Sequence, residues 1–414
     1  MIAFAWRCRA LLLLLLLPAP LAAQPARDKR PPVTILISID GFRPDYLDRG
    51  LTPNLNALAE RGVRGALKPS FPTKTFPNHT ALVTGLRPDR NGIVGNTMLD
   101  PRRPGQLFSL GNPAQALDPF WWDESEPIWV SAERAGVRTA TMYWPGSEVA
   151  IDGVRPSDWW RYDQNVSNRQ RVAGVVDWLR RPAATRPRLV TLYFDTVDTA
   201  GHRFAADSME LRDAIAEVDQ RIGELVSGLN VLRQPANIMV VSDHGMTPAD
   251  PAKVVELTQF IDLPSILPVE MGMYAAIEPT AGTDDRVFDA LVGAHDHVTC
   301  WRKADVPDRL HYGRNPRVAA IVCLPEIGWT LTAGPPRFPI EGGDHGGDNE
   351  DPAVRALFIA AGPAFRVRAT APIVDNVDVY PVLRRLIGLA PVPSDADDDL
   401  VEAAMRSKTM RSVR

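Results

Sequence analysis

The sequence predicts an α/β fold with a mostly parallel central sheet, helices on both faces of that sheet and a small inserted α+β subdomain. Strand-like apolar runs alternate with helical patterns through most of the 414 residues, which favours parallel strands connected by helices. This rhythm breaks from Pro248 to about Gly342, where a proline-rich stretch carries a shorter strand–helix–strand pattern. A composition of 45% hydrophobic and 23% charged residues is typical of a globular chain with a sizeable core.

Each predicted element follows from its own apolar pattern. Short apolar runs predict strands at Val33–Ile39, Arg138–Trp144, Leu189–Phe194, Ile238–Val241, Val318–Val322 and Ala356–Ala361. Helical patterns predict helices at Leu51–Arg61, Pro127–Ala135, Arg169–Leu179, Ser208–Leu232 and, as a closing helix, Val374–Leu389. In the longest of these, apolar residues recur at Leu211, Ile215, Val218, Ile222 and Leu225, the three-to-four spacing of one helix face. We expect the acidic run SDADDDL that follows the closing helix to be a mobile tail.

The first 23 residues have the pattern of a secretory signal peptide. Arg7 and Arg9 form the positive region, Leu11–Leu17 the apolar region, and small residues allow cleavage after Ala23. The alternative is a membrane anchor, but seven leucines are too few to span a bilayer. We therefore expect a periplasmic or secreted mature chain, residues 24–414, without a membrane span.

The charge of the chain limits its partners. The formal net charge is −4, and it becomes −6 when the two arginines of the signal peptide are removed. No basic arm is present in the sequence. Binding of duplex nucleic acid through a broad electropositive surface is therefore not expected.

Two cysteines follow the expected cleavage site, Cys300 and Cys323, and neither lies near the histidine clusters. An even number in an oxidising compartment favours a disulfide between them. Two buried free thiols are the alternative. In either case we expect the cysteines to be structural.

Acidic and histidine side chains follow three of the predicted strands, and one more histidine stands in a glycine-rich loop, GGDHGGDN. The residues are Asp40, Asp198, His202, Asp243, His244 and His345. In a parallel α/β sheet, functional residues gather at the carboxyl ends of the strands. Taken singly, an aspartate after a strand often caps a turn, and a single histidine is more often a hydrogen-bonded or surface residue than a ligand.

Taken together, these residues favour a metal site, because three of the seven histidines in the chain occupy such contexts. Six nitrogen and oxygen ligands give two zinc ions three protein ligands each, with positions left for a nucleophile or a substrate oxygen. Manganese and iron accept the same ligand types.

The stretch FPTKTFPNHTAL, Phe71–Leu82, places a candidate nucleophile just before a helical pattern. Thr75 is either part of an ordinary turn or a nucleophile, and a nucleophile needs a base or a metal to lower the pKa of its hydroxyl. Two divalent cations outweigh three carboxylates, so the site attracts an anionic phosphate ester and favours the alkoxide. Paired metals stabilise both oxygens of an in-line phosphoryl displacement. The residues therefore predict phosphoryl transfer.

Eight motifs in a shared order make the chain resemble the nucleotide pyrophosphatase/phosphodiesterase family of the alkaline phosphatase superfamily. The motifs are IDGFRPDYL, PTKTFPNH, LVTGLRPDRNGIVGN, EPIWV, YWPGSE, FDTVDTAGH, SDHGM and DHGGDN. The resemblance runs from Val33 to about Leu389 and is closest to the compact bacterial members. It implies an alkaline-phosphatase-like three-layer α/β/α fold and hydrolysis of nucleotide phosphodiester or pyrophosphate bonds to nucleoside 5′-monophosphates.

The resemblance also implies roles for single residues. Thr75 matches the nucleophile, which contacts a zinc ion and forms a phosphothreonine intermediate. Asn96 matches an asparagine that donates a hydrogen bond to a phosphoryl oxygen. The zinc ion that activates the nucleophile has ligands matching Asp40, Asp243 and His244. The other zinc ion has ligands matching Asp198, His202 and His345.

A nucleotide pocket is implied beside the nucleophile. Phe76 directly follows Thr75, Tyr162 matches a tyrosine that stacks on the base, and Leu110 aligns with an apolar residue of the same pocket. An aromatic slot holds a nucleobase by stacking. The alternative is that Phe76 and Leu110 belong to the core and that Trp159 or Trp160 stacks on the base instead.

The sequence departs from the family pattern at Asp344, where relatives have an uncharged residue before the histidine. If this carboxylate points into the site, it weakens the attraction for anions. The segment VDTAGH also lacks the proline and serines of many relatives. Three other functions stay open: a lipid or choline phosphodiesterase with the same chemistry, a phosphomonoesterase, and a non-catalytic metal-binding module.

Overall fold

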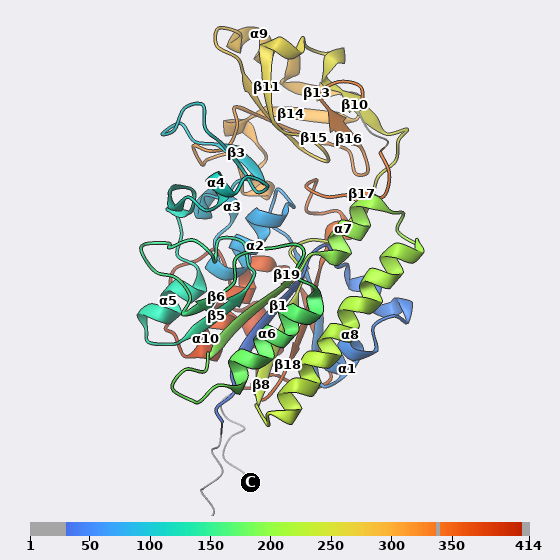
Figure 1. Ribbon diagram of the computed structural model, residues 1–414. Coiled ribbons are helices and arrows are strands. Elements are labelled where there is room, and N and C mark those ends of the chain that lie inside the picture. Colours follow the sequence, from blue (N-terminus) through green and yellow to red (C-terminus); the bar gives the residue numbers. More distant parts are fainter. Residues whose placement is uncertain (1–29, 337–339, 408–414) are drawn as a thin grey trace, which may run out of the picture.

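A large central sheet forms the middle layer of the protein (Figure 1). The computed structural model describes residues 30–336 and 340–407, so the predicted signal peptide lies outside the described residues. The sheet has eight strands in the order β19-β2-β18-β8-β1-β7-β5-β6. Only β18 runs against its neighbours, β2 and β8, and every other pair is parallel. The predicted α/β class with a mostly parallel sheet is confirmed.

The strands of this sheet vary in length from two residues to seven. They are β1 Val33–Ile39, β2 Gly62–Lys68, β5 Thr139–Met142, β6 Asp158–Trp159, β7 Leu189–Phe194, β8 Ala236–Val241, β18 Ala356–Ala361 and β19 Ala369–Asp375. The α-helices are α1 Pro53–Glu60, α2 Thr75–Thr84, α3 Pro88–Asn91, α4 Pro113–Ala116, α5 Ile128–Arg134, α6 Asn168–Arg180, α7 Thr196–Arg203, α8 Met209–Val231, α9 Asp284–Leu291, α10 Val379–Ile387 and α11 Asp399–Ala404.

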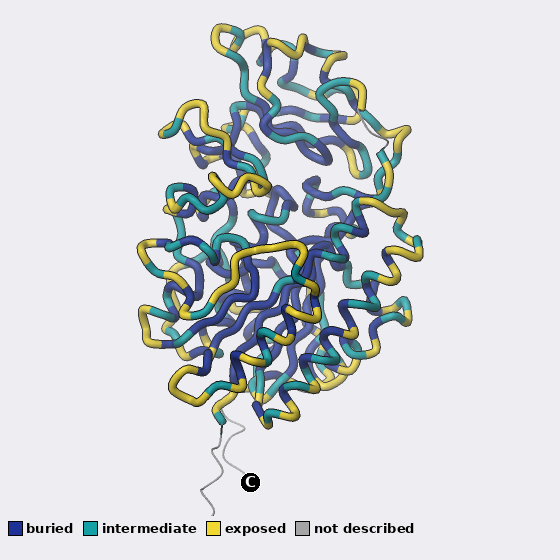
Figure 2. Tube along the Cα trace, viewed as in Figure 1, coloured by how far each residue is buried: buried dark blue, intermediate teal, exposed yellow. Residues whose placement is uncertain are grey.

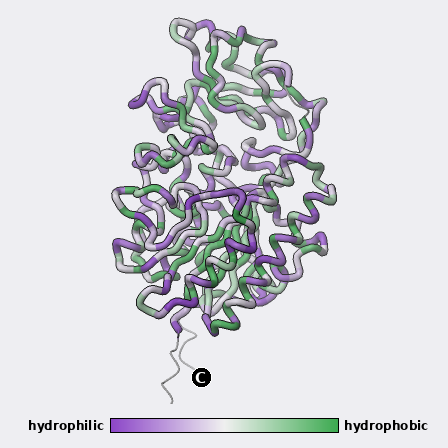
Figure 3. The backbone as a smooth tube through the Cα atoms, in the orientation of Figure 1, coloured by the Kyte–Doolittle hydropathy of each residue, from purple (hydrophilic) through white to green (hydrophobic). Residues whose placement is uncertain are grey.

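Helices cover both faces of the sheet. The evidence is that the side chains of the central strands alternate between two cores, each shared with a different set of helices. In β1, Ile35 and Ile37 pack into a core shared with α1, α6, α7 and α8, whereas Leu36 packs into a core shared with α2, α5, α10 and α11. Alternation is the ordinary consequence of strand geometry, and burial on both faces explains the continuous apolar sequence of β1. Figure 2 shows the buried strands between helices whose outer faces are exposed, and Figure 3 shows the matching change from hydrophobic strands to hydrophilic helix surfaces.

The end of the chain differs from the sequence prediction. The predicted closing helix at Val374–Leu389 begins only at Val379, because its first residues end β19 and form a short 3₁₀ turn at Asn376–Asp378. The predicted mobile tail is also wrong. Its residues lead into α11, whose Leu400, Val401 and Ala404 are buried in the core beneath α10. The acidic residues of SDADDDL suggested an exposed segment, and the short apolar face of α11 that follows was therefore not predicted.

Residues between β9 (Thr247–Pro248) and β17 (Gly343–Asp344) form a second sheet with its own core, which we call the inserted unit. Its five antiparallel strands lie in the order β11-β12-β15-β14-β13. In Figure 1 this unit lies at the top, beyond the carboxyl ends of the main parallel strands. These five strands are β11 Ile266–Glu270, β12 Ala275–Pro279, β13 Gly293–His295, β14 Val298–Arg302 and β15 Ile321–Pro325. Two more strands of the unit, β10 Val254–Glu256 and β16 Thr330–Thr332, form a separate parallel pair. The small hairpin of β3 Thr97–Leu99 and β4 Leu107–Ser109 lies beside it.

Cys300 on β14 and Cys323 on β15 are directly opposite each other and form a disulfide. The alternative of two free thiols is therefore not what the structure has. The predicted strand Val318–Val322 corresponds to β15, which begins three residues later, at Ile321. Within residues 30–336 and 340–407, no helix is long and apolar enough to cross a membrane.

Candidate active site

The structure brings the six predicted metal ligands together at the carboxyl edge of the central sheet. They are contributed by Asp40 after β1, Asp198 and His202 on α7, Asp243 and His244 after β8, and His345 after β17. One residue separates β7 from α7, and the four-residue spacing of Asp198 and His202 puts both on one face of that helix. The topology of the fold, and not proximity in sequence, therefore creates the cluster.

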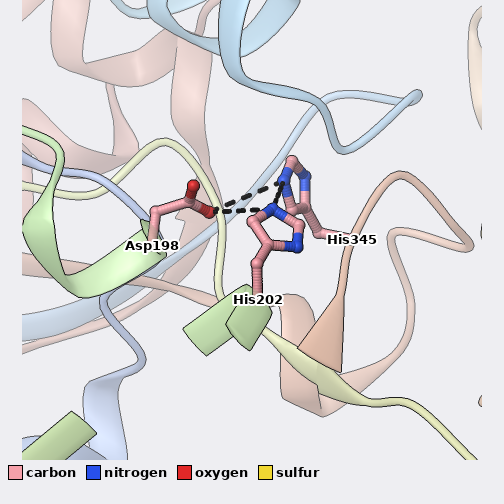
Figure 4. A group of neighbouring side chains, drawn as sticks. All are labelled: Asp198, His202 and His345. Carbon is pink, nitrogen blue, oxygen red and sulfur yellow. Dashed lines mark hydrogen bonds and ion pairs between the residues drawn. The ribbon is translucent and has the colours of Figure 1, made fainter. Parts of the chain in front are cut away.

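Asp198, His202 and His345 form one group, and Figure 4 shows their side chains pointing toward a common centre. The Nε2 atoms of His202 and His345 are 3.1 Å apart. Asp198 Oδ1 lies 3.4 Å from His202 Nε2 and 3.6 Å from His345 Nε2. Three potential ligand atoms thus face the same point.

Asp40, Asp243 and His244 converge beside the candidate nucleophile. His244 Nε2 lies 3.0 Å from Asp243 Oδ2 and 3.4 Å from Asp40 Oδ1. The hydroxyl of Thr75 is 3.3 Å from the same nitrogen. Asp40 and His244 also form a group with Asp198, so the two ligand sets adjoin each other.

Hydrogen bonds to the backbone orient all three imidazoles in the same way. Nδ1 of His202 bonds the carbonyl of Gly343 at 2.9 Å, Nδ1 of His345 that of Thr73 at 2.8 Å, and Nδ1 of His244 that of Gly245 at 2.9 Å. A carbonyl oxygen only accepts, so each Nδ1 carries the proton and each Nε2 presents a lone pair to the centre. This is the tautomer that a metal-binding histidine needs.

Buried carboxylate oxygens that lack a hydrogen bond indicate that these residues fit divalent cations. Oδ1 of Asp40, Oδ1 of Asp198 and Oδ2 of Asp243 are buried without a hydrogen-bond partner among the described residues. Burial raises the pKa of Asp40, and the nearby carboxylates of Asp243 and Asp198 raise it further. Burial also lowers the pKa of His345, which keeps that imidazole neutral. Crowded carboxylates, together with imidazoles whose Nε2 atoms face them, form a donor set that fits divalent cations.

Thr75 is the first residue of α2, so its hydroxyl lies at the positive end of that helix. Asn96 lies beside it, and its Oδ1 accepts a 2.9 Å hydrogen bond from the backbone N–H of Phe76. That bond fixes the orientation of the carboxamide and leaves its NH₂ group without an acceptor in the described part of the chain. Both Thr75 and Asn96 line the same cavity.

Two further residues at the site were missed by the sequence analysis. His79 is fully buried, and its ring bonds the Thr75 carbonyl at 2.9 Å and the Ser38 hydroxyl at 2.8 Å. Tyr193 donates a 2.6 Å hydrogen bond to Oδ2 of Asp40. The position of His79, one helical turn after Thr75 in the same motif, was a signal that was available. Tyr193 lies inside an ordinary strand pattern and gave no signal.

The cavity at Thr75 has a volume of about 370 Å³, and several aromatic residues line it. Phe76, Leu110 and Tyr162 all line it, whereas Trp159 and Trp160 are not among its lining residues. Tyr162 is held by a 2.6 Å hydrogen bond from its hydroxyl to Asp195. The three residues named from sequence thus share one cavity with the candidate nucleophile.

Asp344 is paired with a neighbouring lysine. Its Oδ1 lies 3.4 Å from the ammonium nitrogen of Lys74, the residue before Thr75. Burial alone would lower the pKa of Lys74, but Asp344 and Glu270 outweigh burial and raise it. The ammonium of Lys74 therefore offsets the negative charge of Asp344, the residue at which the sequence departs from the family pattern.

Comparison with known proteins agrees with this geometry. The model of the type I phosphodiesterase / nucleotide pyrophosphatase family matches residues 34–348. The chain belongs to this family. An uncharacterized pyrophosphatase/phosphodiesterase of Schizosaccharomyces pombe is 39% identical over 87% of this chain and 78% of the relative. A bis(5′-adenosyl)-triphosphatase of Xenopus laevis is 35% identical over 88% of this chain and 79% of the relative.

A solved structure shows the same fold as this nucleotide pyrophosphatase/phosphodiesterase. It is an inactive threonine-to-alanine variant of murine ectonucleotide pyrophosphatase/phosphodiesterase 5 in complex with AMP. The TM-score is 0.86 at 34% identity, with 90% of this chain and 100% of that chain covered. The protein is therefore a hydrolase of the alkaline phosphatase superfamily, with acidic and histidine groups able to hold metal.

Proposed function

We propose that the protein is a two-zinc phosphodiesterase that hydrolyses nucleotide phosphodiester or pyrophosphate bonds to nucleoside 5′-monophosphates. The observation that carries the proposal is the position of the Thr75 hydroxyl, 3.3 Å from His244 Nε2, in the same cavity as Phe76 and Tyr162. Four of the six proposed ligands line that cavity together with the aromatic residues, namely Asp40, Asp198, His202 and His345. The AMP complex of the murine relative and the dinucleotide named for the Xenopus relative support a nucleotide as substrate.

The ligand sets divide between two ions. Asp40, Asp243 and His244 would hold the ion beside Thr75, and Asp198, His202 and His345 would hold the other. Zinc bound at these groups supplies Lewis-acid activation of the attacking oxygen and charge neutralisation at the leaving oxygen.

The chain's own residues carry the reaction in two steps. Thr75 Oγ1 gives up its proton to solvent and attacks phosphorus in line, the bond to the leaving oxygen breaks, and that oxygen departs with the electron pair, which gives a phosphothreonine. Water then loses a proton and attacks the same phosphorus, the bond to Thr75 Oγ1 breaks, and Oγ1 takes up a proton, which releases the nucleoside 5′-monophosphate with net retention at phosphorus. Asn96 donates through its NH₂ group to a phosphoryl oxygen, and Phe76 and Tyr162 hold the base with Leu110 at the pocket edge.

The test compares p-nitrophenyl thymidine 5′-monophosphate with p-nitrophenyl phosphate and glycerophosphocholine, with metal analysis of the same sample. We expect the nucleotide diester to be turned over far faster than the other two, with about two zinc ions per chain. Thr75→Ala should abolish turnover without loss of zinc. A preference for the monoester or for glycerophosphocholine would replace the proposed substrate class, and unchanged turnover by Thr75→Ala would exclude the nucleophile.

We also propose that residues 1–23 are removed on export and that the mature chain is periplasmic or secreted. The pattern of Arg7, Arg9 and the seven leucines supports this, as does the disulfide between Cys300 and Cys323. N-terminal sequencing of the native protein should begin at Gln24.

A further inference from the structure

A lysine and two carboxylates lie between the inserted unit and the active site, outside the proposed ligand set. Lys74 is 7% exposed, and its ammonium nitrogen is paired with Asp344 at 3.4 Å. Glu270 ends β11 of the inserted unit and also acts electrostatically on Lys74. We call Lys74, Glu270 and Asp344 the Lys74 cluster.

Two glycines with left-handed backbone make room for this cluster. A Cβ atom on Gly346, at φ +116°, would lie 2.4 Å from Cε of Lys74. A Cβ atom on Gly272, at φ +132°, would lie 2.8 Å from Oδ2 of Asp344. Gly272 belongs to the inserted unit, and Gly346 follows the proposed ligand His345. The chain therefore closes around the ion pair from both sides.

Each member of the cluster is tied to the backbone of one active-site loop. Lys74 immediately precedes Thr75, and Oδ1 of Asp344 accepts a 2.7 Å hydrogen bond from the N–H of His345. Oε2 of Glu270 accepts a 3.3 Å bond from the N–H of Thr97, the residue after Asn96. Tyr274 donates to the same oxygen at 2.8 Å. The nucleophile, the amide donor and one metal ligand are thus linked through three neighbouring charges.

We propose that Lys74, Glu270 and Asp344 position Thr75, Asn96 and His345 relative to one another, so that the inserted unit completes the active site. This inference rests on the proposed function, because it assigns the residues that hold the proposed catalytic groups in place. Lys74 acts through its neighbours and does not bind substrate: its ammonium is paired with Asp344, and it is not among the residues that line the cavity.

The first test separates positioning from substrate binding by the charge of the substrate. Lys74→Met keeps most of the aliphatic stem and removes the ammonium. We expect kcat to fall by about ten- to a hundredfold, the effect of a small misplacement of reacting groups, with the same factor for bis(p-nitrophenyl) phosphate and for diadenosine triphosphate. The KM of each substrate should change less than about threefold. A KM increase confined to the more highly charged triphosphate would show that Lys74 binds substrate and would overturn the proposal.

The second test measures coupling within the cluster. Asp344→Asn should lower kcat in the same way, and the double variant Lys74→Met/Asp344→Asn should lose little more than the stronger single variant, because both remove one interaction. Losses that multiply, or an Asp344→Asn enzyme with unchanged kcat, contradict a shared positioning role. Glu270→Gln keeps an acceptor for Thr97 and should give a smaller loss than Glu270→Ala.

Zinc content and the thermal midpoint of each variant separate positioning from unfolding. A positioning role predicts wild-type zinc content and a kcat loss at temperatures far below the midpoint. Lys68→Met is the matched control, since it removes a lysine that pairs with Glu350 and Asp375 away from the cavity, and its kcat should be unchanged. If Lys74→Met fails to fold, Asp344→Asn and Glu270→Gln carry the test. A wild-type enzyme inactive on both substrates would instead contradict the proposed function.

Discussion

Hydrogen bonds decide what the side chains of the active site can do. Asn96 shows this, because its carbonyl oxygen is occupied by the N–H of Phe76 and only its NH₂ group is left for a ligand. A sequence motif can name such a residue but cannot say which end of the amide faces the substrate. The structure supplies that orientation, and the orientation makes the role of Asn96 testable.

Asn96→Asp should lower kcat by about 10²–10³, the usual cost of losing one donor to a developing negative charge. The aspartate still accepts from Phe76, so the local backbone should stay in place, but it has no N–H to donate and adds a negative charge. Steady-state kinetics on p-nitrophenyl thymidine 5′-monophosphate measures the loss. Asn96→Ala is the comparison variant, and an aspartate variant as active as wild type would show that the NH₂ group is not used.

Sequence reasoning at this scale could propose residues that carry their own chemistry. The six proposed ligands were chosen because they follow predicted strands or stand in a glycine-rich loop and include three of only seven histidines, and the fold brings them together beside Thr75. Tyr193, which bonds Asp40, could not be chosen, because its role depends only on which strand lies beside β1. The pairing of Asp344 with Lys74 could not be predicted from the sequence either, because the two residues are 270 positions apart.

At the scale of whole elements, apolar periodicity gave the bounds of β1, β7 and β18 correctly, and those of α6 and α8 to within one residue. Periodicity carries no direction, so nothing in the sequence of β18 indicated that this strand runs against its neighbours. The strands β2 and β19 were missed because neither has a continuous apolar run: β2 reads GVRGALK and lies only partly buried, and Pro372 interrupts β19. Pairing with β18 gives β2 its conformation, and pairing is a tertiary effect.

The turn before α10 should make stability depend on pH. Asp378 is buried, and burial together with the carboxylates of Asp397 and Asp375 raises its pKa to about 7. A raised native pKa contributes stability that is fully present below the pKa of an unfolded aspartate, about 3.9, and that is lost as the pH rises through about 7. Asp378→Asn should therefore stabilise the protein by about 1–2 kcal/mol at pH 8, after allowance for solvent screening, and little at pH 5.

Thermal unfolding of wild type and Asp378→Asn at the two pH values measures this difference. Asn can still accept the 3.0 Å hydrogen bond from the N–H of Asp397. The exposed Asp398, which pairs with Arg385, provides the control, and Asp398→Asn should not show the same dependence on pH. An equal effect of Asp378→Asn at pH 5 and pH 8 would contradict the raised pKa.

The disulfide should stabilise the inserted unit without entering the chemistry. Cys300 and Cys323 are separated by 23 positions, and closing a loop of that size contributes about 3 kcal/mol in the chain-entropy model. Cys300→Ala/Cys323→Ala should lower the thermal midpoint accordingly and leave kcat unchanged well below it. Calorimetry on the double variant checks the prediction, and loss of activity in a fully folded sample would contradict it.

At the scale of the whole molecule, the proposed metal ions connect segments that are far apart in the chain. The ligands run from Asp40 to His345 and enter the site from several elements. An ion that binds only the folded state adds stability by mass action, about 4 kcal/mol at a thousandfold excess over Kd. Removing metal with a chelator should therefore abolish turnover and lower the thermal midpoint by several degrees.

Added zinc should restore both the midpoint and the activity. His202→Ala is the comparison variant, because it removes one ligand of one set and leaves Asp40, Asp243 and His244 in place. Its midpoint should respond less to the chelator than that of wild type. A wild-type midpoint that does not respond to chelation would show that the clustered carboxylates do not need a cation to fold.

The pairing of β9 with β17 affects which part of this protein can change in length during evolution. Thr247 lies opposite Asp344, and Pro248 opposite Gly343, so the chain leaves the main body and re-enters it at adjacent points. Lengthening a closed loop costs little free energy, since the entropy of closure grows only with the logarithm of its length. The segment between these two strands can therefore gain or lose residues during evolution, provided that it keeps Glu270, while His345 just beyond them keeps its position in the site.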